Sequence, residues 1–179
     1  MSLSMSRISL LLAVLLASCT FADDTAKIAS PKVDLDAVVA EGVVAPVDGI
    51  STAGQPDAAA FKVFADSGYA AVIDLRTAGE NRGLEDEPGL VAGLGMEYVP
   101  LPIGKGDITV AKARELAELI DRYDAPVLVH CGSANRVGAL LALEAYDETG
   151  DAALALEVGR AGGMTGLEST VKEVIEAGE

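Results

Sequence analysis

The sequence predicts an α/β domain in which a mostly parallel central sheet is flanked by helices. Two observations lead to this prediction. Short apolar runs of strand length alternate with segments of helical periodicity, and further helical stretches close the chain. Residues 34–179 also have the length of one domain and contain no internal repeat. Ligands of such domains bind beyond the carboxyl ends of the strands.

The strands are expected where apolar runs are bounded by Gly, Pro or charged residues, at 49–52, 70–75, 96–101 and 127–130. The helices are expected at 56–67, 87–94, 109–123, 136–148, 152–160 and 167–177. Pro56 suits the first position of the first helix, and Gly68 follows its end. The segment 109–123 is the clearest amphipathic helix, because its small and apolar residues recur at i, i+3, i+4 and i+7.

The first 18 residues have the pattern of a signal peptide. They carry Arg7, no acidic residue, and an apolar run over 10–16, which is too short for a permanent membrane span. The residues before Cys19 resemble a bacterial lipobox, which predicts Cys19 as the lipidated first residue of an exported lipoprotein. Simple cleavage after Ala22 is the alternative. Residues 19–33 have the composition of a tether.

The composition is strongly acidic, with 13 Lys and Arg against 28 Asp and Glu and a formal net charge of −15. Such a surface repels nucleic acid and anionic lipid headgroups, so we expect no nucleic-acid partner and membrane attachment only through Cys19. An anion must therefore be bound by a local device such as a helix N-terminus. One His and one other Cys are too few for the usual zinc sites, and neither a metal nor a cofactor is predicted.

The stretch HCGSANR, from His130 to Arg136, holds the only His of the chain and its second Cys. A strand that ends at Cys131, four loop residues and a helix that begins at Arg136 would gather backbone N–H groups and a helix N-terminus around one point. A thiolate is stabilised there, and a guanidinium binds two oxyanion oxygens at once. The alternative is a buried Cys that packs as a small apolar residue. The oxyanion-binding loop would consist of Gly132, Ser133, Ala134 and Asn135.

The same stretch resembles the active-site loop of cysteine-dependent phosphatases and rhodaneses. Four further stretches, STAGQP, AVIDLRTAGE, YVPLPI and PVLVHC, resemble the bacterial dual-specificity-phosphatase-like family, which is often fused to beta-lactamase-fold hydrolases and described as a sulfurtransferase or phosphatase. The resemblance covers about 43–176. It implies a cysteine-phosphatase-like three-layer domain, with Cys131 as nucleophile, Arg136 as oxyanion ligand and His130 in support.

Three features depart from the phosphatase pattern. Four residues separate Cys131 from Arg136, as in rhodaneses, whereas cysteine phosphatases have five; the bacterial family that the chain resembles also has four. Ala134 stands where the family has Gly, which would cost about 1 kcal/mol if that position needs a positive φ. Val137 replaces the hydroxyl residue that helps the thiolate leave in phosphatases.

A phosphatase also needs a general acid, and Asp107 comes from the region where such enzymes carry it. Asp107 or Thr109 as the cap of the next helix is the alternative. Arg76 and Glu80 follow the strand expected at 70–75. They either line the rim of the same candidate site or form a surface ion pair. Gln55, which matches a family signature, serves either the turn beside Pro56 or ligand contact.

We therefore predict an exported, lipid-anchored, periplasm-facing hydrolase of the cysteine-phosphatase type. Its substrate would be a small anion or a phosphoprotein. Two alternatives remain open: a rhodanese-type sulfurtransferase acting through a Cys131 persulfide, and a non-catalytic lipoprotein that binds an anion or a partner.

Overall fold

The computed structural model describes residues 40–41, 45–47 and 49–178, and the predicted signal peptide, Cys19 and tether lie outside them. A five-stranded sheet of order β2-β3-β7-β5-β6 forms the centre of this part. Its strands are β2 (Ala45–Val47), β3 (Ile50–Ala53), β5 (Ala71–Asp74), β6 (Glu97–Pro100) and β7 (Val127–His130). All pairs are parallel except β2 with β3, so the predicted, mostly parallel sheet is confirmed.

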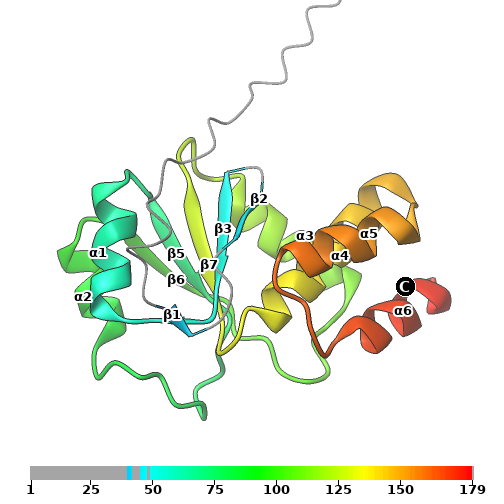
Figure 1. Cartoon of the computed structure of the whole chain (residues 1–179), viewed down its shortest axis with the longest axis horizontal. Helices are drawn as coiled ribbons and strands as arrows, with labels where there is room; N and C mark the ends of the chain where they lie inside the picture. Colours follow the sequence, from blue (N-terminus) through cyan, green and yellow to red (C-terminus); the bar gives the residue numbers. More distant parts are fainter. Residues whose placement is uncertain (1–39, 42–44, 48, 179) are drawn as a thin grey trace, which may run out of the picture.

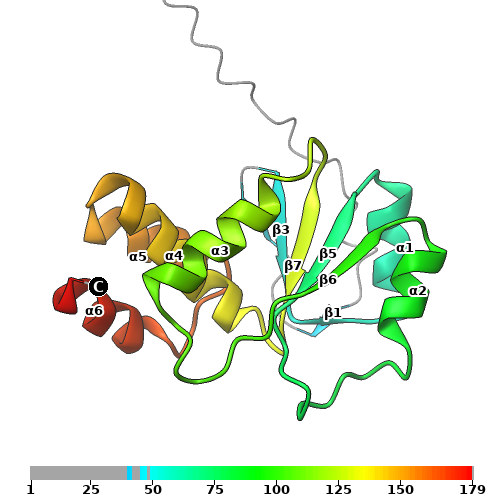
Figure 2. The same ribbon diagram turned by 180° about the vertical axis from the view of Figure 1, so that it is seen from behind.

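Helices cover both faces of the sheet (Figures 1 and 2). One face carries α1 (Ala58–Asp66) and α2 (Glu87–Gly93), and the other carries α3 (Val110–Ile120), α4 (Asn135–Thr149), α5 (Ala152–Ala161) and α6 (Glu168–Ala177). The predicted three-layer α/β fold is therefore confirmed. None of the helices in the described ranges has the length and apolarity needed to cross a membrane.

The core is divided by the sheet into two clusters. Successive strand residues face opposite sides, so Leu128 packs with Phe61 and Phe64 under α1, whereas Val127 and Val129 pack under α3 and α4. All four residues of β5 and of β7 are buried, because these strands lie inside the sheet with helices on both faces. The alternation also separates two adjacent residues, His130 and Cys131. His130 contacts Phe61 on the α1 side, whereas Cys131 packs on the α4 side.

The three neighbouring strands β3, β7 and β5 end at the same level of the sheet. His130, the last residue of β7, is paired with Ala53 of β3 and with Asp74 of β5. The chain segments that follow these three strands therefore meet at the carboxyl edge of the sheet, which is where ligands bind in parallel α/β folds.

The predicted element boundaries need one correction near Pro56. This residue does not open the first helix but lies in the two-residue strand β4 (Gln55–Pro56), which pairs with β1 (Ala40–Glu41). The helix α1 begins at Ala58 instead. Its N-cap is Asp57, whose carboxylate accepts a hydrogen bond of 2.8 Å from the amide of Ala60.

Candidate active site

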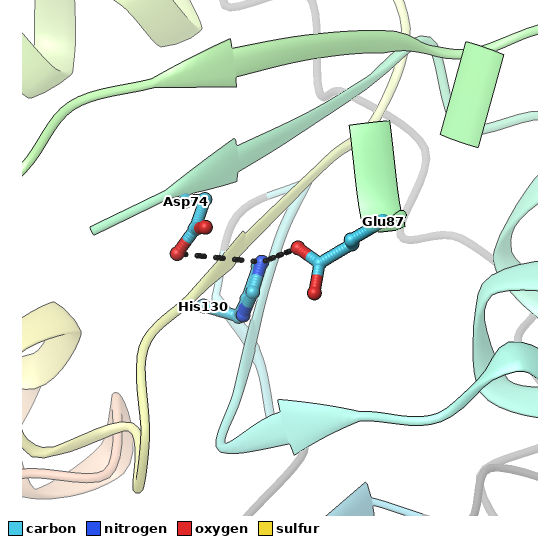
Figure 3. Close-up of side chains that lie close together, drawn as sticks. All are labelled: Asp74, Glu87 and His130. Atoms are coloured by element: carbon cyan, nitrogen blue, oxygen red, sulfur yellow. Dashed lines mark ion pairs between the residues drawn. The ribbon is translucent and has the colours of Figure 1, made fainter. Parts of the chain in front are cut away.

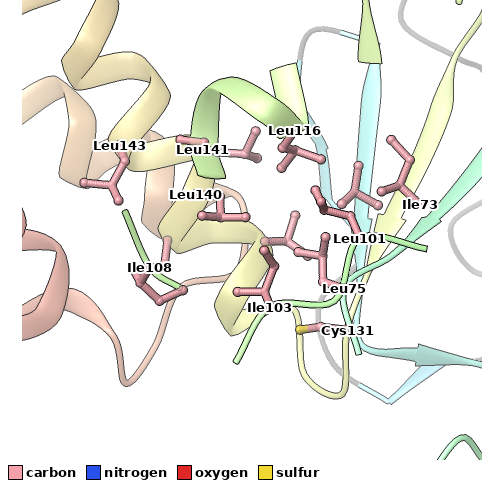
Figure 4. Packing of buried hydrophobic residues seen from close by; sticks show 14 of the residues in the cluster. Ile73, Leu75, Leu101, Ile103, Ile108, Leu116, Cys131, Leu140, Leu141 and Leu143 are labelled. Atoms are coloured by element: carbon pink, nitrogen blue, oxygen red, sulfur yellow. The ribbon is translucent and has the colours of Figure 1, made fainter. Parts of the chain in front are cut away.

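The loop between β7 and α4 has the predicted strand, loop and helix arrangement. The amide of Cys131 donates to Ala53 O over 3.3 Å, and Ser133 forms an isolated antiparallel bridge with Gly54, so the loop is attached to the end of β3. Cys131 lies where the strand turns into the loop, at the edge of the apolar core (Figure 4). Only 1% of the residue is exposed, which places its thiol at the base of the loop.

Ala134 shapes the loop through an unusual backbone conformation. Its φ of 60° is the only positive value of a non-glycine residue in the described ranges. The residue is the N-cap of α4 and provides no side-chain cap, so the first turn of the helix keeps its amides available for an anion. The Ala134 side chain is fully buried against Gly163, where an added Cβ would lie 2.5 Å from the Cβ of Ala134.

Arg136 is oriented by Glu80. The sequence predicts Glu80 at the rim of the site or in a surface ion pair with Arg76, and it does not predict this contact. The two terminal nitrogens of the guanidinium donate to the two carboxylate oxygens over 2.7 and 2.5 Å. Nη1 also donates to the carbonyls of Ile103 and Leu75, at 3.0 and 3.3 Å. The hydrogen bonds from Arg136, and next those from Thr77, lower the pKa of Glu80 to about 2.

This ion pair leaves one edge of the guanidinium available. Nη1 and one Nη2 hydrogen face Glu80, whereas Nε–H donates to no atom of the described residues. The hydrogen bond with Glu80 raises the pKa of Arg136. The guanidinium adjoins the loop, because a Cβ added at Gly132 would lie 3.8 Å from Arg136 Nη2. The Nε edge is the one that can bind an oxyanion held by the loop.

A cavity of about 420 Å³ opens beside Arg136. Its walls combine apolar side chains with the polar ends of several loops: Thr77, Glu80, Ile103, Gly104, Lys105, Ile108, Asn135, Arg136 and Leu167. Arg136 and Asn135 are the two predicted site residues among them. Cys131, Gly132, Ser133, Ala134 and Asp107 do not line it.

Asp107 closes a turn in the structure. Its Oδ2 accepts a hydrogen bond of 2.8 Å from the amide of Gly104. The cap of α3 is Thr109, whose hydroxyl accepts from the amide of Lys112 at 3.2 Å. The capping interaction expected for Asp107 or Thr109 is thus provided by Thr109, whereas the side chain of Asp107 is bound to the backbone of its own loop.

His130 belongs to a buried charge cluster on the opposite face of the sheet (Figure 3). Its Nε2 lies 3.1 Å from Glu87 Oε1 and 3.8 Å from Asp74 Oδ1. The ring makes an edge contact with Phe61, and neither ring nitrogen has a hydrogen-bond partner among the described residues. His130 thus lies on the opposite side of the sheet from Cys131, and its supporting role in the reaction stays a prediction.

Arg76 is the centre of that cluster, so the expectation that it lines the rim is wrong. It is 1% exposed, and it donates from Nε to Asp74 over 2.9 Å and from Nη2 to Glu87 over 2.5 Å. Burial alone would raise the pKa of Asp74, but the hydrogen bonds from Arg76, together with His130 and Tyr98, lower it to about 2. Sequence reasoning missed the cluster because its members come from three separate elements.

Asp74, Glu87 and His130 have the donor types of a metal site, with ligand atoms within 4.8 Å of one another. Their surroundings favour an ion-pair network instead. The buried Arg76 forms ion pairs with both carboxylates, and Arg82 forms a second ion pair with Asp74 over 2.9 Å. Adding a divalent cation would place three positive groups around two carboxylates, which is unfavourable in a buried site.

The chain resembles known proteins in both sequence and fold. A beta-lactamase hydrolase-like protein from Xylella fastidiosa is 33% identical over 97 residues, and one from Agrobacterium fabrum is 30% identical over 102 residues. These stretches make up 52% and 55% of this chain but 22% and 24% of the relatives, so the chain spans about a quarter of the length of the curated proteins it matches. No family profile matches it.

Several solved structures have a similar fold, and some of them are named as phosphatases. A "putative phosphatase" from Neisseria meningitidis has a TM-score of 0.62 and 20% identity over 72% of this chain and 92% of its own. P. aeruginosa TpbA in complex with pTyr has a TM-score of 0.56 and 16% identity over 70% of this chain and 77% of its own. The resemblance predicted from the motifs is thus confirmed, and the described part of the chain is an α/β domain of the cysteine-phosphatase fold.

Proposed function

We propose that the protein is a cysteine-dependent hydrolase of phosphate monoesters. The observation that carries this proposal is the orientation of Arg136 beside the loop of Cys131: Glu80 holds both terminal nitrogens of the guanidinium, while Nε–H donates to no atom of the described residues. A phosphoryl group in the loop would receive hydrogen bonds from that edge and from the N-terminus of α4, which favours its negative charge.

The reaction would proceed in two steps. The Cys131 thiolate attacks phosphorus, an S–P bond forms, and the ester P–O bond breaks as the leaving oxygen takes up a proton. Water then attacks phosphorus and gives a proton to the group that protonated the leaving oxygen, the S–P bond breaks, and phosphate and the thiolate are released. Asp107 is the candidate proton donor for the first step, and it would have to leave the amide of Gly104 to reach the substrate. The pTyr bound to TpbA supports a phosphate ester as the substrate.

Sulfane-sulfur transfer is the second candidate, and the loop favours it. Only four residues separate Cys131 from Arg136, the thiol is buried, and Asp107 is bound to Gly104. In this reaction the thiolate takes the outer sulfur of a donor such as thiosulfate, sulfite leaves, and the Cys131 persulfide passes its sulfur to an acceptor thiolate or cyanide. No proton donor is required.

The deciding experiment uses the full chain and its Cys131→Ser variant, each incubated separately with p-nitrophenyl phosphate and with thiosulfate plus cyanide. Nitrophenol release that requires Cys131 supports the hydrolase, and thiocyanate release that requires Cys131 supports the sulfurtransferase. Intact-protein mass spectrometry identifies the adduct as phosphoryl or persulfide. If neither product depends on Cys131, both enzyme proposals fail and the non-catalytic anion-binding module becomes the preferred function.

Arg136→Lys tests the role of the guanidinium fork. Lysine keeps the positive charge but cannot bind two oxygens in a plane, so we expect the rate of the Cys131-dependent reaction to fall by roughly 100-fold or more. A matched control is Arg114→Lys, because Arg114 of α3 donates two hydrogen bonds to the carboxylate of Asp147 of α4 at the exposed surface. An equal effect of both changes would contradict the proposed role of Arg136.

We also propose that the protein is exported and attached to a membrane through lipid on Cys19. The support is the signal-peptide pattern of the sequence. Metabolic labelling with a fatty acid, compared between the chain and Cys19→Ala, tests this, and equal labelling of both would overturn it.

A further inference from the structure

We propose that the contact between α3 and α4 is pH-sensitive: it is firm while Glu144 is protonated, and it loosens when Glu144, Asp121 and Glu148 are all ionised. This inference concerns the helices on the α4 side of the sheet and does not rest on the proposed function. It depends on three observations: the acidic ends of both helices, the lack of a positive partner for Glu144, and the burial of its side chain.

The two helices lie against each other, and both end in acidic residues (Figure 2). The C-cap of α3 is Asp121, and α4 carries Glu144 and Glu148 in its C-terminal half. Neither helix has a basic residue in its last turn, although the C-terminal end of a helix favours positive charge. Glu144 and Glu148 are four positions apart on α4, so they also repel each other along one face of the helix.

Glu144 has no positive partner. Its carboxylate takes part in no hydrogen bond among the described residues, and the charged groups that act on it are Glu148 and Asp121. The helices packed against α4 are α3, α5 and α6. All of their basic side chains are paired with other carboxylates: Lys112 with Glu115, Arg114 with Asp147, and Arg160 and Lys172 with Glu168.

Two charge interactions of opposite sign therefore act between α3 and α4. Arg114 and Asp147 attract each other across the contact, over 2.6 Å. Asp121 and Glu144 repel each other when both are ionised. Arg122, which follows Asp121, acts on the hydroxyl of Tyr123. Protonation of Glu144 removes the repulsion and leaves the attraction in place.

The burial of Glu144 determines the pH at which this happens. The side chain is half-buried, which disfavours its ionised form. Burial, and after it the charges of Glu148 and Asp121, raise the pKa of Glu144 from 4.5 to about 7. Because the folded pKa lies above the unfolded one, the stability that Glu144 contributes is complete below pH 4.5 and is lost as the pH rises toward 7.

The contact between α3 and α4 joins two walls of the cavity. α4 begins at the oxyanion-binding loop and carries Arg136 in its first turn, and α3 follows the segment that contains Ile103 and Ile108. These three residues line the cavity. A rise in pH through neutrality should thus loosen the connection between the walls without titrating a residue of the lining.

Thermal unfolding of the full chain and its Glu144→Gln variant, from pH 4 to pH 8, tests the inference. Glutamine has the shape of protonated glutamate and carries no charge. We expect the melting temperature of the variant to exceed that of the parent by about 5 °C or more at pH 8, and the two to agree near pH 4. Glu173→Gln, a change at an exposed residue of α6, is the matched control. A difference between parent and Glu144→Gln that stays constant with pH, or that the control reproduces in full, overturns the inference.

Asp121→Asn tests the contribution of α3 separately. The change removes one of the two charges that act on Glu144 and keeps its burial, so the titration of Glu144 should move to lower pH. Carbon NMR of the Glu144 carboxyl follows that titration directly. A general loss of structure would expose the carboxyl and abolish the dependence on Glu148 as well, which Glu148→Gln in the same background reveals. An unchanged titration midpoint in Asp121→Asn contradicts the interaction across the contact.

Hydrogen exchange locates the change within the molecule. With rates corrected for the intrinsic exchange at each pH, amides in the last turns of α3 and α4 should be at least 10-fold less protected at pH 8 than at pH 6 in the parent. Glu144→Gln should remove most of this difference. An equal loss of protection in β5 and β7 would show that the whole domain is destabilised and would contradict a local loosening of the two helices.

Discussion

Glu80 and Arg136, 56 residues apart in the sequence, form a two-point ion pair at the carboxyl edge of the sheet. Glu80 is itself anchored, because its Oε1 accepts from the amide and the hydroxyl of Thr77 at 2.7 and 3.0 Å. The turn after β5 thus determines the direction in which the guanidinium of α4 points. The proposed anion binding at the loop would therefore depend on the segment from Thr77 to Glu80, which carries no reacting group.

Glu80→Gln is expected to destabilise the fold in a pH-dependent way. The folded pKa of Glu80, about 2, lies below the ordinary value of 4.5, so ionised Glu80 contributes stability above pH 4.5 that is lost as the pH falls toward 2. The difference in free energy of unfolding between parent and variant should be largest near pH 7 and vanish near pH 2. Urea unfolding at several pH values measures it. Glu118→Gln, a change at an exposed residue of α3, is the matched control.

Gly163→Ala is expected to disturb the active-site loop from outside. Gly163 has a φ of 97°, and its added Cβ would lie 2.5 Å from the Cβ of Ala134. We expect a loss of about 2 kcal/mol or more from strain and overpacking together. Adding Ala134→Gly should restore part of this loss, because it removes one of the two colliding methyl groups. Strictly additive effects in the thermal-unfolding double-mutant cycle would contradict the contact.

Gly138→Ala should separate α4 from α5. A Cβ at this position would lie 2.4 Å from Gly159 O and 2.4 Å from Met164 N, and backbone atoms cannot move away cheaply. We expect destabilisation of about 3 kcal/mol. Gly93→Ala, in α2 with open space around the new Cβ, should instead stabilise by about 0.5 kcal/mol. Chemical denaturation of both variants checks the contrast, and similar effects would refute the close helix crossing.

Glu87→Gln is expected to be among the most destabilising polar substitutions. It removes one of the two carboxylates that neutralise Arg76 inside the protein, where an uncompensated charge costs about 3 kcal/mol or more. Asp66→Asn, which breaks the exposed pair with Lys62, should change stability very little. Equilibrium unfolding at pH 7 measures both. A small loss for Glu87→Gln would indicate that Asp74 alone suffices for Arg76.

The candidate site shows how far local patterns reach. The order HCGSANR was enough to place Cys131 at the end of a strand and Arg136 at the start of a helix, because strand and helix signals depend on neighbouring residues. The family resemblance, and not local periodicity, singled out Ala134, because the family has Gly there; its φ of 60° shows that the position does adopt a positive value. Local reasoning went wrong at Pro56, where a two-residue pairing with β1 took the place of a helical first turn.

The sequence by itself therefore determined the α/β class, the order of elements and the loop that carries the thiol and the guanidinium, since these follow from periodicity and residue type over short distances. Only the tertiary structure decided that Glu80 orients Arg136, that Leu167 faces Ile103 across a cavity, and that Arg76 is buried between two carboxylates. The physical reason is that these pairings depend on which strand ends lie side by side in the sheet. A charged residue of a given local pattern becomes a surface pair or a buried one according to what covers it.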